Sequence, residues 1–458
     1  TDGQVLTSTG SGVGWEDAAS GGASNVNGLS DAKTFGTSSI MIGDATTGTI
    51  DAANYNTGLG VDVFAALTSG DNNTVLGFSA GNDLTTGAQN AFIGSLAGDA
   101  TTTGENNVAL GHAALGANTT ADDNVAIGAF SLDANTTGAN NTAVGKSALG
   151  ANTTGANNSA VGTSALANNT TANRNTAVGF QGMLANTTGA ENAALGYNSL
   201  TANTEGNRNV SVGDAALDAN TTGSDNVAIG QQSLGSNTTA STNTAIGQKA
   251  LFANTTGAQN TAVGAEALVA NTTGQQNVAV GYLALDANTT GEFNTAIGKE
   301  SMTTNTTGDR NVAVGFKALQ IMNVTDGSHT FNTAVGFAAG QLTTTGINNT
   351  FMGANAGNAN TTGASNVCIG AGAGDAITTG SNNTIIGDFA GTTTLADTIV
   401  LASGTTQRMQ INSSGSVMIG NYTGSHDDTG HNFNANGTGL QVHTVTNNEA
   451  NIYNNHGG

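Results

Sequence analysis

The sequence predicts an all-β fold, a parallel β-solenoid (β-roll) built from coils of 17 residues. The unit NTAVGKSALGANTTGAN, residues 141–157, recurs with its first glycine 17 residues apart from Gly77 to Gly315 and, after one step of 21, from Gly336 to Gly387. A fixed short period is the signature of a solenoid. Seventeen residues are too few for a helical hairpin, and the apolar runs are too short for helices. The absence of proline among 458 residues fits a chain whose backbone N–H groups are committed to ladders.

Each coil is predicted to contain two short strands and two turns. We number its positions from the asparagine, which is present in all nineteen copies from Asn73 to Asn383. Glycines at positions 5 and 15 are expected where the chain bends. The position-1 asparagines are interpreted as a structural ladder at a turn, hydrogen-bonded along the stack, in preference to a ligand-binding row. The ladder residues are Asn124, Asn141, Asn158, Gly128, Gly145 and Gly162.

The chain is expected to have four parts. Residues 1–38 form an attachment or linker segment, and residues 39–72 form degenerate capping coils, as the ends of repeat arrays commonly do. The regular repeats span 73–394. Residues 395–458 form a β-rich tip or connector, with turns at Gly404 and at Ser414-Gly415 and a further strand over 440–445.

Positions 3 and 4 predict an oligomer. Adjacent residues of a strand point to opposite sides, yet both positions are apolar throughout, as in Ala143 and Val144. One side fills the coil, and the other would leave an apolar line far longer than monomers expose. Identical chains around an axis are the simplest cover for that line.

Positions 3 and 9 are expected to share one packing compartment. Central coils pair a small residue at position 3 with a large one at position 9 (Ala143 with Leu149, Ala177 with Met183). Several outer coils have the large residue at position 3 and glycine at position 9, which suggests that the combined volume of the two side chains is conserved. The coil with Ala334 and Gly340, which follows the four-residue insertion, breaks the rule. The reversed pairs, large at position 3 with Gly at 9, are Val75/Gly81, Phe92/Gly98, Phe351/Gly357, Cys368/Gly374 and Ile385/Gly391.

These motifs resemble two groups of proteins. The NTAVG unit with alanine three places on resembles the head repeats of trimeric autotransporter (YadA-like) adhesins. The longer unit with ANTTG, the opening TDGQVLTSTGSGVGWED and the ending DTIVLASGTTQRMQINSSGSVMIG resemble bacteriophage tail-fibre proteins, notably of marine phages. The resemblance covers most of the chain and implies a left-handed, homotrimeric solenoid. The 17-residue coil differs from the usual 14 of the adhesins, and we expect no coiled-coil stalk or membrane-anchor barrel from these residues, which favours the tail-fibre resemblance.

Composition excludes several function classes. With 31 acidic and nine basic residues, the net charge of −22 would repel phosphate backbones, so nucleic-acid binding is not expected. The single Cys368 cannot form a disulfide within one chain and is interpreted as a small buried hydrophobe at position 3. No apolar run has transmembrane length, so membrane insertion is not expected.

Several other motifs suggest sites, but a structural explanation is favoured for each. The Asn-Thr-Thr triplets are formal glycosylation sequons, but the repeat explains them as a turn. Neighbouring threonines face opposite ways and so do not make the flat array of an ice-binding face. The run Gly370–Gly374 lacks the strand–helix context of a phosphate loop. Asp122 and Asp123 lack the spacing of calcium-binding rolls. The sequons include Asn118, Asn135, Asn152, Asn254 and Asn360.

Four histidines near the C-terminal end are the candidate tip residues, with polar surface as the alternative to metal binding. No catalytic residue, cofactor or metal is predicted. The expected function is passive: a virion tail fibre outside the cell, whose partners are its own copies, other tail-fibre or baseplate proteins, and a host-cell glycan or protein receptor. A bacterial surface adhesin or filament is the alternative, and a glycan-degrading tailspike is a weaker one. The histidines are His426, His431, His443 and His456.

Overall fold

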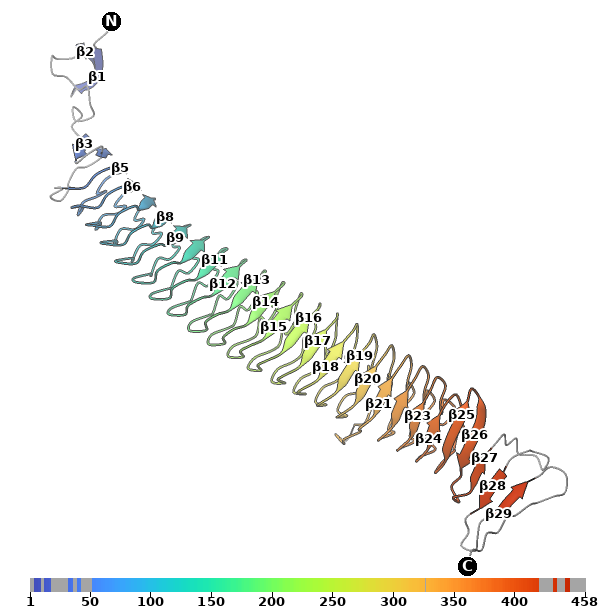
Figure 1. The fold of residues 1–458 in the computed structure, drawn as a ribbon. Coiled ribbons are helices and arrows are strands. Elements are labelled where there is room, and N and C mark those ends of the chain that lie inside the picture. Colours follow the sequence, from blue (N-terminus) through green and yellow to red (C-terminus); the bar gives the residue numbers. More distant parts are fainter. Residues whose placement is uncertain are drawn as a thin grey trace, which may run out of the picture. The chain divides into compact units, whose positions relative to one another are not determined.

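The computed structural model describes residues 52–325 and 327–419, together with six strands outside these ranges. The chain divides into two compact units, Thr1–Ser211 and Val212–Gly458. Every regular element among the described residues is a β-strand. β1 and β2 form a sheet of their own, and from β3 onward consecutive strands stack side by side within each unit (Figure 1). The predicted all-β parallel solenoid with a period of 17 residues is therefore confirmed.

In the first unit, antiparallel pairs precede a parallel stack. β1 (Gln4–Thr9) pairs with β2 (Gly12–Asp17), and β3 (Ala32–Phe35) pairs with β4 (Ser39–Ile42). β4 then begins the parallel ladder. Its strands are β5 (Thr57–Leu59), β6 (Thr74–Leu76), β7 (Ala91–Ile93), β8 (Val108–Leu110), β9 (Val125–Ile127), β10 (Thr142–Val144), β11 (Ser159–Val161), β12 (Thr176–Val178) and β13 (Ala193–Leu195), and β14 (Val210–Val212) includes the unit boundary.

In the second unit, the parallel ladder ends in an antiparallel sheet. The ladder contains β15 (Val227–Ile229), β16 (Thr244–Ile246), β17 (Thr261–Val263), β18 (Val278–Val280), β19 (Thr295–Ile297), β20 (Val312–Val314), β21 (Thr333–Val335), β22 (Thr350–Met352), β23 (Val367–Ile369) and β24 (Thr384–Ile386). β24 pairs in parallel with β25 (Ile399–Ser403). Antiparallel pairing then joins β25, β26 (Thr406–Ile411), β27 (Val417–Ile419), β28 (His431–Asn434) and β29 (Gln441–Thr444). The predicted hairpin turns at Gly404 and Ser414-Gly415 are confirmed.

Each coil contains one strand, so the prediction of two strands per coil is wrong. Positions 2 to 4 are extended, and positions 6 to 11 form consecutive turns. The reason is the backbone at positions 7 and 9: Ser147 and Leu149 have φ of 55° and 52°, which breaks an extended run. The turns still bond along the stack, because Ser147 N donates to Ala129 O at 3.0 Å and Leu149 N donates to Ala165 O at 3.0 Å.

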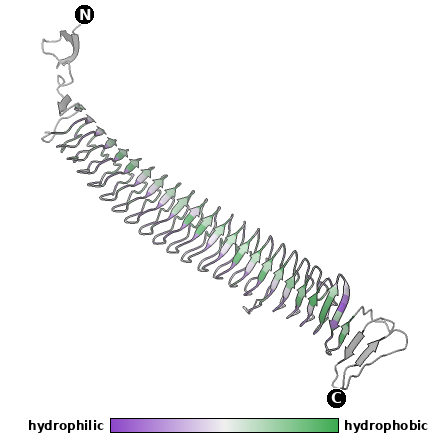
Figure 2. Ribbon diagram, viewed as in Figure 1, coloured by the Kyte–Doolittle hydropathy of each residue, from purple (hydrophilic) through white to green (hydrophobic). Residues whose placement is uncertain are grey.

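The strands are in register position for position. Ala143 lies between Ala126 and Ala160 of the neighbouring strands. Position-3 side chains point into the coil, and Ala143 is fully buried, whereas positions 2 and 4 point outward. Figure 2 shows the strands as the apolar segment of most coils. This arrangement puts one apolar row inside each unit and a second on its surface.

Candidate functional sites: internal ladders and the exposed strand face

The position-1 asparagines form the predicted ladder. Asn141 accepts the backbone N–H of Asn158 at its Oδ1 (3.0 Å), and its own N–H donates to Oδ1 of Asn124 at 3.0 Å. The Asn141 amide donates to Asn124 Oδ1 at 3.2 Å and to Gly155 O at 2.9 Å. All three asparagine side chains are fully buried. A buried amide that satisfies groups above and below it is a structural element of the stack.

A second asparagine ladder, at position 12, was not predicted. Asn152 donates to Oδ1 of Asn135 at 2.9 Å and to Gly155 O at 2.9 Å. The amides of positions 1 and 12 thus converge on the same position-15 carbonyl of their coil. The signal in the sequence is the recurrence of the ANTTG asparagine, which is interpreted from the sequence as part of a structural turn but not as a ladder. The sequon asparagines Asn118, Asn135, Asn152, Asn254 and Asn360 are all buried, so the folded chain does not present them for modification.

The position-5 glycines are required by the backbone. Gly128, Gly145 and Gly162 have φ between 129° and 137°, where residues with a side chain are strained. A Cβ at Gly145 would also lie 2.5 Å from the carbonyl oxygen of Gly162 in the next coil. The predicted role of these glycines as structural ladder residues therefore follows from both the turn and the close stacking of coils.

The compartment shared by positions 3 and 9 is present. A Cβ at Gly98 would lie 2.8 Å from the Phe92 ring, and one at Gly374 would lie 2.5 Å from Cys368 Sγ. Each ring also extends into the adjacent coil: a Cβ at Gly340 would lie 2.6 Å from the ring of Phe351. The Ala334/Gly340 coil is thereby explained, because the neighbouring phenylalanine fills its space.

The pair Ile385/Gly391 has an additional neighbour. The atom nearest to a Cβ at Gly391 belongs to Ile377, at 2.8 Å. Ile377 occupies position 12, where most coils carry the ladder asparagine, and its apolar side chain extends toward Gly391. At the end of the regular repeat, the side chain at position 12 therefore fills part of the space that positions 3 and 9 share.

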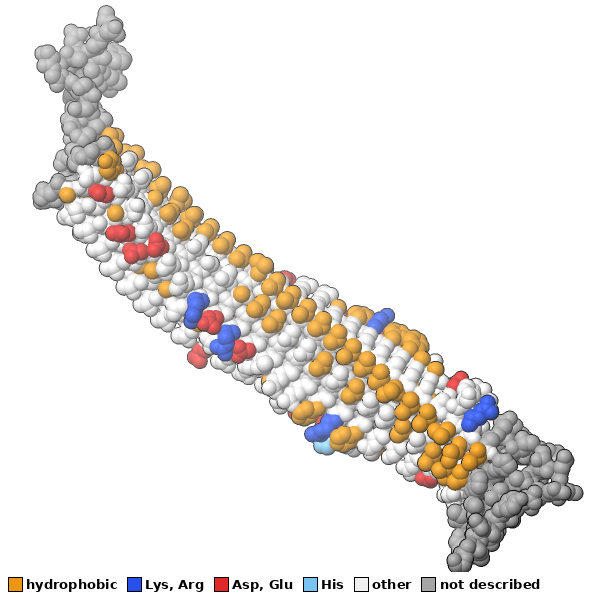
Figure 3. Space-filling view, viewed as in Figure 1, with side chains coloured by type: hydrophobic (Ala, Val, Ile, Leu, Met, Phe, Trp, Pro, Cys, Tyr) orange, Lys and Arg blue, Asp and Glu red, His pale blue; other side chains and the backbone are white. Residues whose placement is uncertain are grey.

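An apolar line on the strand face is the main surface feature of both units. It consists of the outward position-4 side chains, of which Leu195 is 51% exposed and Ile127 is 36% exposed. Figure 3 shows apolar side chains running from coil to coil along the stack within each unit. We call this row the apolar line. The prediction that one of positions 3 and 4 fills the coil and the other faces outward is confirmed for the described coils, and the outward one is position 4. Its exposed members include Leu59, Leu76, Ile93, Leu110, Ile127, Val161 and Leu195 in the first unit and Ile229, Ile246, Ile297, Met352 and Ile386 in the second.

The C-terminal histidines remain a prediction. His431 lies in β28 and His443 in β29, and the two strands pair so that His443 lies opposite Asn432. His426 and His456 lie outside the described residues. Across the part of the chain that the structure describes, no group of three or more His, Cys, Asp or Glu residues could hold a metal ion.

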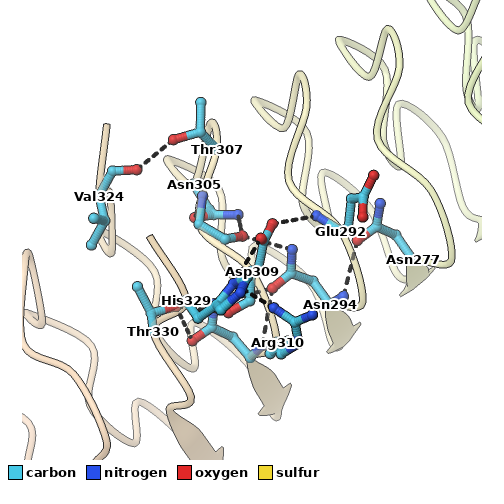
Figure 4. Close-up of polar contacts among 12 residues, drawn as sticks. Asn277, Glu292, Asn294, Asn305, Thr307, Asp309, Arg310, Val324, His329 and Thr330 are labelled. Carbon is cyan, nitrogen blue, oxygen red and sulfur yellow. Dashed lines mark hydrogen bonds and ion pairs between the residues drawn. The ribbon is translucent and has the colours of Figure 1, made fainter. Parts of the chain in front are cut away.

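A cluster of polar contacts surrounds the four-residue insertion (Figure 4), and two phenylalanine rings join it. Arg310 lies between the rings of Phe293 and Phe331, with its guanidinium carbon 5.0 Å and 5.9 Å from their centroids. His329, from the insertion, contacts Arg310 and lies 3.2 Å from an oxygen of Asp309. The other Asp309 oxygen accepts the Glu292 N–H at 2.7 Å. These groups join neighbouring coils, as the amide ladders do inside.

The calcium hypothesis for Asp122 and Asp123 gains no support from their geometry. Asp122 Oδ1 accepts the backbone N–H of Glu105 at 2.8 Å, which makes it a link between coils. Asp286 is the most perturbed carboxyl group. Burial first, and then the charges of Glu266 and Glu300, raise its pKa from 3.8 to about 6. Its Oδ1 is buried without a hydrogen-bond partner, which destabilises the charged form.

Cys368 is buried at position 3, as predicted, and burial raises the pKa of its thiol to about 12. A neutral thiol in an apolar compartment is a poor nucleophile. The cysteine is therefore a packing residue.

No protein-family model matches the chain, and neither a curated protein nor a solved structure is significantly similar to it. Among the described residues, no helix has the length and apolar character that a membrane crossing requires.

Proposed function

We propose that the protein is a structural and adhesive component of a bacteriophage tail fibre, in which three identical chains form the shaft that carries a host-receptor-binding tip. The observation that carries this proposal is the apolar line. Its position-4 side chains repeat in coil after coil of both units and point away from the packed interior.

The apolar line favours identical chains as its cover. Contiguous exposed apolar surface of this extent is rare on monomers and marks an interaction site. A partner must present apolar side chains at the same spacing over the same length, and another copy of the chain does so by construction. Closed cyclic symmetry is the usual outcome for identical chains. We propose three copies on the resemblance to trimeric fibres and adhesins.

The proposed mechanism is passive. Buried amide ladders bond every coil to the next, which stiffens the shaft, and three tips give multivalent contact with a glycan or protein of the host surface. The tip is placed in residues 395–458, and the other end would join further tail-fibre or baseplate proteins. A bacterial surface adhesin or extracellular filament has the same physical requirements and is the second candidate.

A glycan-degrading tailspike is the weaker alternative. Its catalysis needs a pair of carboxyl groups at a site that holds a sugar. The acidic residues near the insertion are engaged in links between coils, as Asp309 is with Glu292 and His329.

The function can be tested with fluorescently labelled protein and a panel of bacterial strains. We expect saturable binding to a subset of strains, competition by unlabelled protein, and no release of reducing sugar from their surface polysaccharides. Steady release of new reducing ends would overturn the passive mechanism. Absence of saturable binding to every strain, with the tip present, would overturn the attachment role.

A further inference from the structure

Two rows of side chains flank the apolar line. We define the leading edge as the position-17 residues, which precede each strand, and the trailing edge as the position-6 residues, which follow it. Both rows project outward: the Arg174 side chain is 67% exposed on the leading edge, and Phe180 is 43% exposed on the trailing edge. We call the position-17 residue before a strand and the position-6 residue after it a rung. The three-residue strand between them spans about 10 Å of extended chain, which holds the two edges of a rung apart within one chain.

Within each edge, side chains interact along the stack. On the leading edge, Arg174 pairs with Glu191 at 2.7 Å, and Arg310 lies between two phenylalanine rings. On the trailing edge, Phe180 stacks on Tyr197 with centroids 5.4 Å apart. In the second unit, the ammonium of Lys299 lies 5.9 Å from the centroid of the Phe316 ring. These contacts account for the composition of each row taken separately.

The contacts along each edge do not explain why the leading-edge and trailing-edge residues of the same rung are complementary. The residue on the other edge of the same rung, six positions later in the sequence, is Phe180 for Arg174 and Phe316 for Arg310. Lys299, on the trailing edge, has Phe293. Five cations lie on the two edges, and four of them have an aromatic or acidic residue at the same rung, the fourth pair being Arg208 with Asp214. The fifth, Lys146, has Asn140, and no rung carries like charges on both edges.

The insertion preserves this matching. The coil that starts at Asn311 has 21 residues, yet its last residue, Phe331, still precedes the next asparagine and has Phe337 at the offset of six. The four extra residues are accommodated before that point, around His329. The insertion therefore changes the length of the coil but not the offset of six residues between Phe331 and Phe337.

We infer that the leading edge of one chain packs against the trailing edge of a second copy at the same rung. This inference rests on the proposed trimer and specifies its seam. Rotation about an axis parallel to the stack keeps every rung at its height and brings opposite edges together, so Arg310 of one chain faces Phe316 of the next in a cation–π contact. A twofold axis perpendicular to the stack would reverse the order of rungs and lose the matching.

Site-directed cross-linking tests the seam. In the variant Gln259→Cys/Ala265→Cys, one cysteine lies on each edge of a single rung, and neither position is charged or aromatic in the native chain. A bis-maleimide with a reach of about 8 Å is shorter than the strand of about 10 Å that separates the two edges within a chain. The native Cys368 is buried and does not compete. We expect most of the monomer band to be lost on denaturing gels, replaced by a covalent species of three chains.

Controls separate the seam from the trimer. Each single-cysteine variant, and Thr256→Cys/Ala265→Cys with one cysteine on the exposed threonine row, should remain monomeric on the same gel. The native mass of each variant is measured in parallel. A native trimer in which the double variant does not cross-link, or in which one single variant does, would overturn the seam and leave the trimer standing. A native monomer would overturn both.

Discussion

The central and outer coils fill the same interior in opposite ways. In the coil of Asn141, a small Ala143 at position 3 accompanies Leu149 at position 9, and both are fully buried. In the coil of Asn349, the large Phe351 accompanies Gly357, and the ring takes the space of the missing side chain. The ladder at position 1 does not change between these regions. The difference shows that positions 3 and 9 can exchange large and small side chains as long as their combined volume fills the interior. Position 1, in contrast, requires asparagine.

Removing the large member of a reversed pair should have the largest effect. Phe351→Ala leaves a cavity between Gly340 and Gly357, neither of which has a side chain to fill it. We expect a loss of about 4 kcal/mol in the free energy of unfolding, measured by denaturant titration followed by circular dichroism. Leu342→Ala, at an exposed side chain that lies neither in the apolar line nor on its two edges, is the control and should cost much less. Equal losses for the two variants would show that the compartment is not closed.

Adding a large side chain opposite an existing one should cost about 3 kcal/mol. Gly357→Leu would overlap the Phe351 ring. The backbone itself accepts leucine there, because Leu149 has φ of 52° at the same position and Gly357 has φ of 58°.

The double variant Phe351→Ala/Gly357→Leu sharpens the comparison, because it converts an outer coil into a central one. We expect it to recover most of the loss of either single variant, leaving about 1 kcal/mol. Additive losses in the double variant would contradict the shared compartment. The same denaturant titration measures all three.

The two asparagine ladders should differ in strength. Asn158→Ala removes the acceptor of the buried Asn175 N–H, so we expect a loss of about 2 kcal/mol. Asn169→Ala at position 12 should cost about 1 kcal/mol, since the carbonyl of Ala172 still receives the Asn158 amide at 2.9 Å. Thermal unfolding of the two variants compares them, and a larger loss for Asn169→Ala would reverse the proposed roles.

The smallest effect concerns Asp286, which has no counterpart in most central coils. Its pKa is raised by burial from 3.8 to about 6 in the folded chain, so the folded state binds a proton more tightly than the unfolded state does. This carboxyl therefore contributes stability as the pH falls from above 6 towards 4 and opposes folding at pH 7. We expect Asp286→Asn to raise the melting temperature at pH 7.5 and to change it little at pH 4. A lower melting temperature at pH 7.5 would contradict the unsatisfied buried carboxylate.

Much of the fold could be predicted because one physical pattern is repeated. The period of 17, the inward position 3 and the outward position 4 follow from spacing and apolar character alone. The second strand of each coil could not be excluded, because Leu149 is apolar and strand-like in composition while its backbone is left-handed. The position-12 ladder was missed since a buried Asn-Thr-Thr turn and an exposed sequon have the same letters.

The central claim is that identical chains cover the apolar line, and the solution mass of the native protein tests it most directly. Multi-angle light scattering of the intact chain, repeated after mild heating in detergent, measures it. We expect three times 44.8 kDa, retained after that treatment, because the strand faces of three chains are buried together. A stable 44.8 kDa monomer at the same concentration would contradict the account, since the apolar line would then face water along its whole length.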